Sequence, residues 1–177
     1  MKATGRTLTL RGTASGIPGN GVYTNFNILE YANVLDINKA WRVRWFEVLP
    51  TNLKAQTDCR FTVKSILATD DIVSSGPEQI FEDNRQIGWN NDQYLVGRDG
   101  AQQQTSSAQG FTASKIIIDP DHIIQRRLDI NIAVAGAIAA EAEKYKVNYI
   151  VYLEEFQITA NEAIISNIKS VAQDVDN

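Results

Sequence analysis

Apolar and polar residues alternate with a period of two over much of the chain, and this pattern predicts half-buried β-strands. The predicted strands cover residues 7–10, 22–31, 41–48, 61–67, 115–118, 128–134 and 147–154. Together with an irregular apolar segment at residues 79–89, the pattern indicates about eight strands. No strand–helix–strand alternation occurs, so a parallel α/β sheet is not expected.

The segment WRVRWFEV at residues 41–48 changes phase within its strand. Trp41, Val43 and Trp45 fall on one face, whereas Phe46 and Val48 fall on the opposite face. A shift of one residue is what a β-bulge produces, and it predicts a bulge near Trp45 and Phe46. A strand buried on both faces from Trp45 onward would give the same pattern, so both interpretations stay open.

The last segment of the chain carries the one clear helical pattern. Thr159 followed by Glu162 fits a capping box, and Ile158 with Ala163 fits a hydrophobic staple. Apolar residues then recur at helical spacing in a stripe of Ile164, Ile165, Ile168, Val171 and Val175. The pattern predicts an amphipathic helix over residues 160–173. Its stripe can cap the chain's own fold or pack on another copy, and the sequence does not decide between them.

These elements predict an all-β fold, and two antiparallel sheets with long polar loops fit an eight-stranded jelly-roll sandwich with a C-terminal amphipathic helix. An up-and-down barrel is the main competitor, although barrels favour short, even hairpins. We expect residues 1–21 to form an N-terminal arm with the first strand and loop. Residues 22–158 would form the jelly roll, with an exposed loop at 99–110, and residues 159–177 the helix and tail.

Composition fits an ordinary globular domain. The chain has 177 residues, of which 44 % are hydrophobic and 21 % charged, enough to bury one full core. The longest apolar segment, at residues 130–140, is too short for a membrane span. Residues 1–20 lack the apolar region of a signal peptide. A single cysteine excludes an intrachain disulfide and suits a reducing compartment.

Charge is spread unevenly along the chain. Residues 1–29 carry Lys2, Arg6 and Arg11 and no acidic residue, whereas residues 141–177 carry an excess of acids. A basic N-terminus can form an arm that contacts an acidic partner such as nucleic acid. Arms of that kind usually carry a denser run of basic residues, so an ordinary terminus is the simpler interpretation.

The chain offers few residues for catalysis or metal binding. His122 is its only histidine, and it follows Asp119 and Pro120 in a segment typical of a turn. Oxygen ligands for calcium could come from Asp70 and Asp71 together with Asp119 or Asp121, but no calcium-binding motif is present. Glu154 and Glu155 are neighbours in a strand, so they point to opposite faces and cannot flank one glycosidic bond.

Nucleophile and nucleotide motifs are also missing from the sequence. No nucleophile elbow, P-loop or dinucleotide fingerprint occurs. Cys59 lies beside Arg60, but a lone thiol next to a strand is usually structural. Arg126 and Arg127 precede a strand and could contact phosphate or the acids of a neighbouring subunit.

Aromatic residues offer a further candidate site. Trp41, Trp45 and Trp89, with Tyr94, could form a platform for sugars or nucleic-acid bases. Packing in the core is the alternative, and we favour it because the alternation around Trp41 and Trp45 places charge on the other face.

The combined pattern resembles small single-jelly-roll capsid proteins of environmental and marine viruses. The residues that carry the resemblance are WRVRWFEV at 41–48, IGWNNDQYLVG at 87–97, DHIIQRRLDINI at 121–132 and the terminal strand and helix at 147–174. It covers most of the chain from about residue 22 and rests on pattern and order, with no catalytic motif. The thin basic N-terminus departs from many jelly-roll coat proteins, which weakens the case for direct genome packaging.

The resemblance implies a virion structural protein, made in the host cytoplasm, that assembles from many copies into an icosahedral shell. It implies no enzyme activity, cofactor or small-molecule substrate. Subunit contacts would involve Ile164, Ile165, Ile168 and Val171, and Lys2, Arg6 and Arg11 would face the particle interior. Other virion proteins, a viral membrane and weak nucleic-acid contact remain open as partners. A jelly-roll lectin or carbohydrate-binding module that uses one of the tryptophans is the alternative function.

Overall fold

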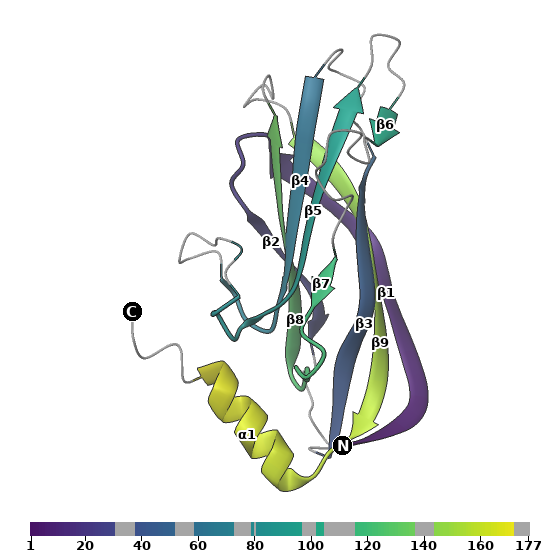
Figure 1. The fold of residues 1–177 in the computed structure, drawn as a ribbon, viewed down its shortest axis with the longest axis vertical. Coiled ribbons are helices and arrows are strands. Elements are labelled where there is room, and N and C mark those ends of the chain that lie inside the picture. The colour runs from purple at the N-terminus through teal and green to yellow at the C-terminus, as the bar shows by residue number, and fades with distance from the viewer. Residues whose placement is uncertain are drawn as a thin grey trace.

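The fold was examined in a computed structural model of the whole chain. The structure describes residues 1–30, 38–51, 59–72, 79, 81–96, 102–104, 116–136 and 144–171. Most of them lie in strands, and one helix follows the last strand (Figure 1).

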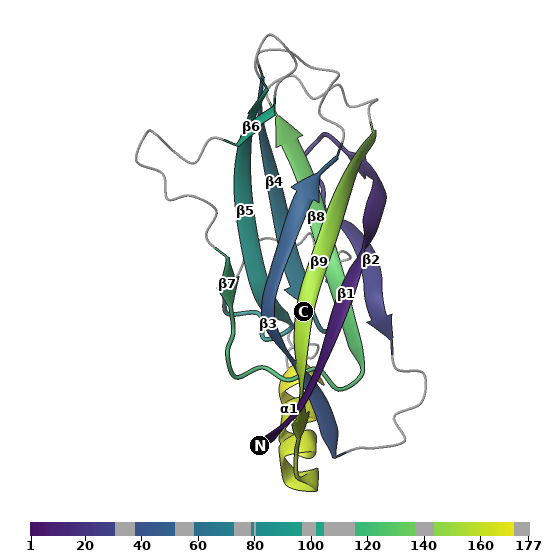
Figure 2. The same ribbon diagram turned by 90° about the vertical axis from the view of Figure 1, so that its right-hand side faces the viewer.

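The strands form two antiparallel sheets that lie face to face (Figure 2). The smaller sheet has the order β1-β9-β3, from β1 (Lys2–Pro18), β9 (Lys144–Gln157) and β3 (Lys39–Pro50). The larger sheet has the order β2-β8-β4-β5-β6, from β2 (Thr24–Glu30), β8 (Arg127–Gly136), β4 (Cys59–Ala68), β5 (Gln86–Val96) and β6 (Gln102–Gln104). The short β7 (Ile117–Ile118) pairs with β5.

The predicted all-β class and the antiparallel two-sheet sandwich are therefore confirmed. The described residues contain nine strands, so the predicted number of eight is not met. The additional strand is β6, whereas β5 overlaps the irregular segment at 79–89 and β7 lies within the predicted strand at 115–118. Of the expected loop at residues 99–110, the structure describes only Gln102–Gln104, which form β6.

Strands far apart in the sequence pair in a nested order. β1 pairs with β9, β2 pairs with β8, and β4 pairs with its neighbour β5. Between the second and the third of these pairs, Trp41 of β3 and Ile124 form an isolated antiparallel bridge. Its two backbone hydrogen bonds measure 2.8 Å and 2.7 Å between nitrogen and oxygen. The first half of the chain is thus matched against the second half in reverse order.

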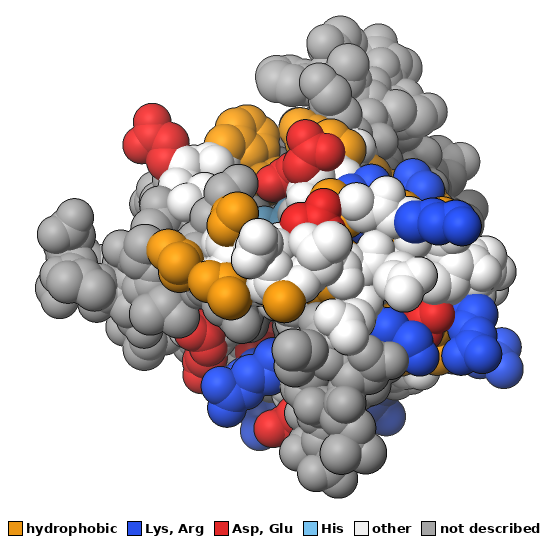
Figure 3. Space-filling model, turned by 90° about the horizontal axis from the view of Figure 1, so that it is seen from below, with side chains coloured by type: hydrophobic (Ala, Val, Ile, Leu, Met, Phe, Trp, Pro, Cys, Tyr) orange, Lys and Arg blue, Asp and Glu red, His pale blue; other side chains and the backbone are white. Residues whose placement is uncertain are grey.

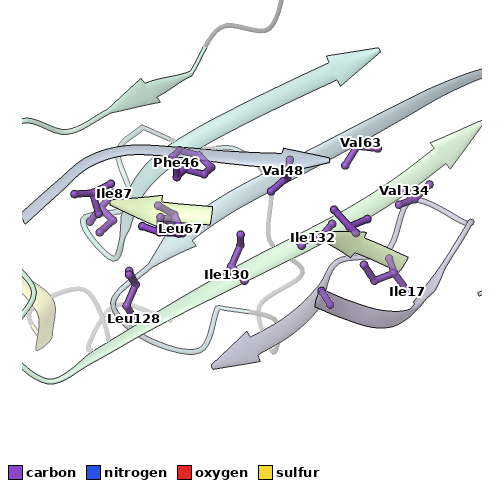
Figure 4. Close-up of a cluster of buried hydrophobic side chains, with 14 of the residues drawn as sticks. Ile17, Phe46, Val48, Val63, Leu67, Ile87, Leu128, Ile130, Ile132 and Val134 are labelled. Carbon is purple, nitrogen blue, oxygen red and sulfur yellow. The ribbon is translucent and has the colours of Figure 1, made fainter. Parts of the chain in front are cut away.

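One main core fills the space between the sheets. Phe46 and Val48 of β3 lie over Leu67 and Val63 of β4, with the isoleucines of β8 beside them (Figure 4). The largest side chains of this core with less than 2 % exposure are Phe46, Ile17, Leu67, Ile87, Ile124, Leu128, Ile130 and Ile132. Full burial of each such side chain contributes about 1.5–3 kcal/mol to stability, so this core dominates the fold.

The predicted bulge in β3 is present, but it lies one or two residues earlier than expected. The pairing of β3 with β9 shifts between Val43 and Trp45. Val43 and Phe46 are buried, whereas Trp45 is 37 % exposed. The prediction that Trp45 shares a face with Val43 is therefore wrong, because the extra residue, Arg44, turns Trp45 to the outside.

The predicted N-terminal strand is much longer than residues 7–10. β1 runs from Lys2 to Pro18 and pairs with β9 along its length, with register shifts after Ala3 and after Ser15. Leu8 and Leu10 lie on the inner face of β1 and pack against the main core. Most of the segment expected as an arm thus belongs to the smaller sheet, as one of its edge strands.

The C-terminal helix forms where it was predicted. α1 spans Ala160–Val171. The backbone N–H of Thr159 donates to Glu162 Oε2 at 2.8 Å, and the N–H of Glu162 donates to Thr159 Oγ1 at 3.3 Å, which is the capping box. Ile158 and Ala163 are buried in one cluster, as the hydrophobic staple requires.

Candidate interaction surface

The helix α1 lies at one end of the sandwich and points away from it (Figure 1). Its anchor is a small buried cluster, separate from the main core, made of Ala40, Ile123, Phe156, Ile158 and Ala163. Ala163 is the only helix residue in that cluster. The first turn of α1 is therefore held by the sandwich, while Ile164, Ile165 and Ile168 lie outside the buried clusters.

Three isoleucines of the predicted stripe are exposed to solvent. The exposed fractions are 56 % for Ile164, 55 % for Ile165 and 60 % for Ile168. The side chain of Val171 lies outside the described part of the structure. Apolar side chains gather on this end of the molecule (Figure 3). We call Ile164, Ile165 and Ile168 the helix stripe.

The basic residues of the N-terminus are all exposed on β1. Lys2, Arg6 and Arg11 point into solvent. Arg11 lies opposite Ile150 of β9, which lies opposite Glu47 of β3, so Arg11 is on the outer face of the smaller sheet. These positions expose all three cations to an external partner.

The outer face of the smaller sheet also carries an exposed aromatic pair. The rings of Trp45 and Tyr152 lie 5.1 Å apart between centroids with an interplanar angle of 41°, and their exposed fractions are 37 % and 40 %. Beside this pair, Arg44 of β3 forms an ion pair with Glu154 of β9. Tyr152 was not singled out from the sequence, because the alternation of β9 alone does not tell which tryptophan lies beside it.

The predicted platform of several tryptophans is not assembled. Trp41 is partly buried at the edge of the main core. Trp89 is only 7 % exposed, and its Nε1 donates to Gln86 Oε1 at 2.8 Å. Tyr94 is also buried in the main core. Packing is thus the correct interpretation for Trp41, Trp89 and Tyr94, and only Trp45 is available to a ligand.

Arg127, which was considered for partner contact, forms an ion pair within the protein. Arg127 Nη2 lies 2.7 Å from Asp129 Oδ2, and Asp129 is fully buried. Asn25 and Asn27 of β2 donate to the same carboxylate at 3.0 Å and 2.8 Å. The hydrogen bond that Arg127 Nε donates to Asp129 Oδ1 raises the pKa of the Arg127 guanidinium. This network joins β2 to β8 within the protein, since a buried carboxylate requires such partners.

The acidic residues and the histidine considered from the sequence lie in separate surroundings. Asp119 Oδ1 accepts from the backbone N–H of Asp121 at 3.0 Å, and His122 Nδ1 lies 3.9 Å from Asp119 Oδ2, as expected for a turn. Glu154 lies on the outer face, whereas Glu155 is buried and accepts from Thr4 Oγ1 at 2.7 Å. Among the described residues, no group of three or more His, Cys, Asp or Glu could hold a metal ion. The calcium ligands considered from the sequence are therefore not brought together.

Comparison with known proteins leaves the family open. No protein-family model matches the sequence, and no curated protein matches it. Within the described ranges, the structure has no helix that is long and apolar enough to cross a membrane. Functional inference rests on the fold and on the surfaces above.

Proposed function

We propose that this chain is a virion structural protein that self-assembles into an icosahedral shell. The observation that carries the proposal is the helix stripe, in which three adjacent isoleucines are more than half exposed on a well-capped helix. A capped amphipathic helix that leaves its apolar face unused by its own fold is typical of an element that packs on another chain.

The nested strand pairing supports the jelly-roll part of the proposal. In a jelly roll, an antiparallel ribbon is wound so that its first strand pairs with its last and the middle strands form a hairpin. The pairs β1 with β9, β2 with β8 and β4 with β5 follow this order. The bridge between Trp41 and Ile124 stands where the remaining pair of the ribbon would be. Jelly rolls of this size occur in capsid proteins and in lectins.

Burial of the helix stripe would stabilise subunit contacts. Each isoleucine contributes about 1.5–3 kcal/mol when it passes from full exposure to full burial, and these three are already about half buried. Their gain on contact is correspondingly smaller, a few kcal/mol in total. A weak contact of this kind suits a shell, because many copies repeat it.

The basic residues of β1 complete the proposed arrangement. Lys2, Arg6 and Arg11 would face the particle interior, where an acidic partner such as the genome can neutralise them. Three cations support only weak or indirect nucleic-acid contact. Other virion proteins and a viral membrane are compatible with the same arrangement.

Substitution of the helix stripe tests the proposal. In the double variant Ile165→Asp and Ile168→Asp, two exposed apolar side chains become charged, so assembly of particles should be lost. The monomer should keep its free energy of unfolding within about 0.5 kcal/mol, since both positions are exposed. Particle yield is measured by sedimentation, and monomer stability by urea unfolding.

A matched control separates the apolar contact from added charge. Asn161 lies on the same helix and is exposed, but it is not part of the helix stripe. Asn161→Asp should leave the particle yield unchanged. A normal yield from the double aspartate variant would contradict the role of the helix stripe.

A carbohydrate-binding module is the second candidate, and the exposed pair of Trp45 and Tyr152 favours it. Aromatic rings present apolar faces that stack on sugar rings, and Arg44 and Glu154 beside them can exchange hydrogen bonds with hydroxyl groups. The capsid proposal and the carbohydrate candidate orient the outer face of the smaller sheet in different directions. Arg11 shares the face with Trp45, so the capsid proposal turns it toward the particle interior, whereas the carbohydrate candidate needs it turned toward an external ligand.

Glycan binding by the purified chain decides the second candidate. A glycan ligand should shift the tryptophan fluorescence, and Trp45→Phe should weaken its binding at least about fivefold, because the larger indole face is lost. Trp89→Phe serves as the control, since Trp89 is buried away from this face. Absence of any response across a glycan array would reject this candidate and leave the capsid proposal unaffected.

A further inference from the structure

A polar cluster lies inside the main core, on strands β4 and β5. β4 and β5 pair in a regular register in which Ser65 lies directly opposite Asn90 and Val63 directly opposite Asp92. Ser65, Asn90 and Asp92 are 0 %, 1 % and 3 % exposed. We call these three residues the core oxygen cluster.

The core oxygen cluster faces the smaller sheet. Side chains alternate along a strand, so Ser65 shares its face with Val63 and Leu67, which belong to the main core. On β5, Asn90 and Asp92 share their face with Gly88, where an added Cβ would lie 3.1 Å from Phe46 Cε1. Figure 4 shows Phe46 and Val48 of β3 over Leu67 and Val63, the two neighbours of Ser65 on this face. The cluster is therefore surrounded by apolar side chains.

Three oxygen atoms of the cluster are left without partners. Asn90 Nδ2 donates to Asp92 Oδ2 at 2.9 Å, which directs Asn90 Oδ1 elsewhere. Ser65 Oγ, Asn90 Oδ1 and Asp92 Oδ1 are buried and accept or donate no hydrogen bond within the part of the chain that the structure describes. An unpaired buried polar atom destabilises the fold, and a buried carboxylate does so more strongly unless a positive charge or a proton neutralises it.

The electrostatic surroundings add negative charge rather than positive. Burial, together with the charges of Asp92 and Glu47, raises the pKa of the Tyr94 hydroxyl. No ion pair to Asp92 occurs among the described residues, although other buried carboxylates such as Asp129 have one. Within the described segments, the cluster thus combines one carboxylate with two neutral oxygens and has no cationic side chain paired to it.

We propose that Ser65, Asn90 and Asp92 form an internal site for one hard monovalent cation, Na⁺ in ordinary solution. Hydroxyl, amide and carboxylate oxygens are the ligands that hard cations take. A single carboxylate matches a monovalent charge, whereas Ca²⁺ takes six to eight oxygens and usually several carboxylates. The site joins β4 to β5 in the folded protein and is absent from the unfolded chain, so the cation stabilises the fold.

Equilibrium unfolding in urea tests the site. Ionic strength is held constant with tetramethylammonium chloride, whose cation is too large for the core, while NaCl replaces it from 10 to 300 mM. For a dissociation constant of about 30 mM, the unfolding equilibrium constant of the wild type should fall about eightfold over this range. Asp92→Asn should abolish the dependence on Na⁺, and Asp121→Asn, which removes a charge from the surface, should retain it.

A second variant covers a failure of Asp92→Asn to fold. Ser65→Ala keeps the carboxylate and removes one ligand, so it should shift the response to higher Na⁺ concentration. A wild-type protein whose unfolding is indifferent to Na⁺ at constant ionic strength would overturn the proposal. A stronger response to CaCl2 at submillimolar concentration would overturn the choice of a monovalent ion.

Discussion

Trp45 and Phe46 are neighbours in the sequence but differ completely in their surroundings. Phe46 is fully buried between the sheets, whereas Trp45 is 37 % exposed on the outer face. The sequence revealed that the phase changes in this strand, because Phe46 and Val48 are out of step with Trp41 and Val43. It could not place the change, since a bulge and a strand buried on both faces give the same pattern.

Substitution of these two neighbours should have unequal effects on stability. Phe46→Ala removes a side chain from a closely packed core and should lower the free energy of unfolding by about 3–5 kcal/mol. Trp45→Ala removes a partly exposed ring and should cost about 1 kcal/mol, the usual size for an aromatic pair. Urea unfolding of both variants measures the difference, and equal losses would contradict the position of the bulge.

Strand β5 shows why one element was predicted only in part from the sequence. Its core-facing positions include Gly88, Asn90 and Asp92, so the middle of its inner face lacks the apolar residues from which a strand is recognised. The proposed cation site and the incomplete prediction of β5 thus have the same origin, a polar sequence in a buried position. Helix α1, in contrast, carries both its capping box and its staple in local sequence, and its start was predicted correctly.

Protonation of Glu162 should weaken the start of α1. The hydrogen bond from the backbone N–H of Thr159 and the nearby amino group of Met1 lower the pKa of the Glu162 carboxyl below its ordinary value of 4.5. A lowered pKa means that the carboxylate stabilises the fold above pH 4.5 and that this contribution is lost as the pH falls through the lowered value. The amide resonance of Thr159 should therefore move with a midpoint below pH 4.5 in an NMR titration.

A neutral variant provides the control for this titration. Glu162→Gln retains the geometry of a capping box without a titrating group. Its Thr159 amide should keep the same position between pH 3 and pH 6. A midpoint above 4.5 in the wild type would contradict the capping contact.

At the scale of the whole molecule, the strands pair in a nested order, in which the first strand pairs with the last and the second with the last but one. Long-range pairs such as β1 with β9 cannot be derived from local alternation, because each strand pattern is compatible with many partners. The sequence therefore predicted an antiparallel sandwich, whereas the strand order came only from the structure. The same limit applies to the exposed surfaces, since a stripe such as that of α1 looks alike whether its own fold or another copy covers it.

The native mass of the purified chain tests the central claim, self-assembly, most directly. Light scattering across a range of protein concentration and ionic strength, followed by negative-stain imaging, measures it. The account predicts closed shells with a mass in the megadalton range, and their loss in the double variant Ile165→Asp and Ile168→Asp. A monomer of 19.7 kDa under all of these conditions would contradict it.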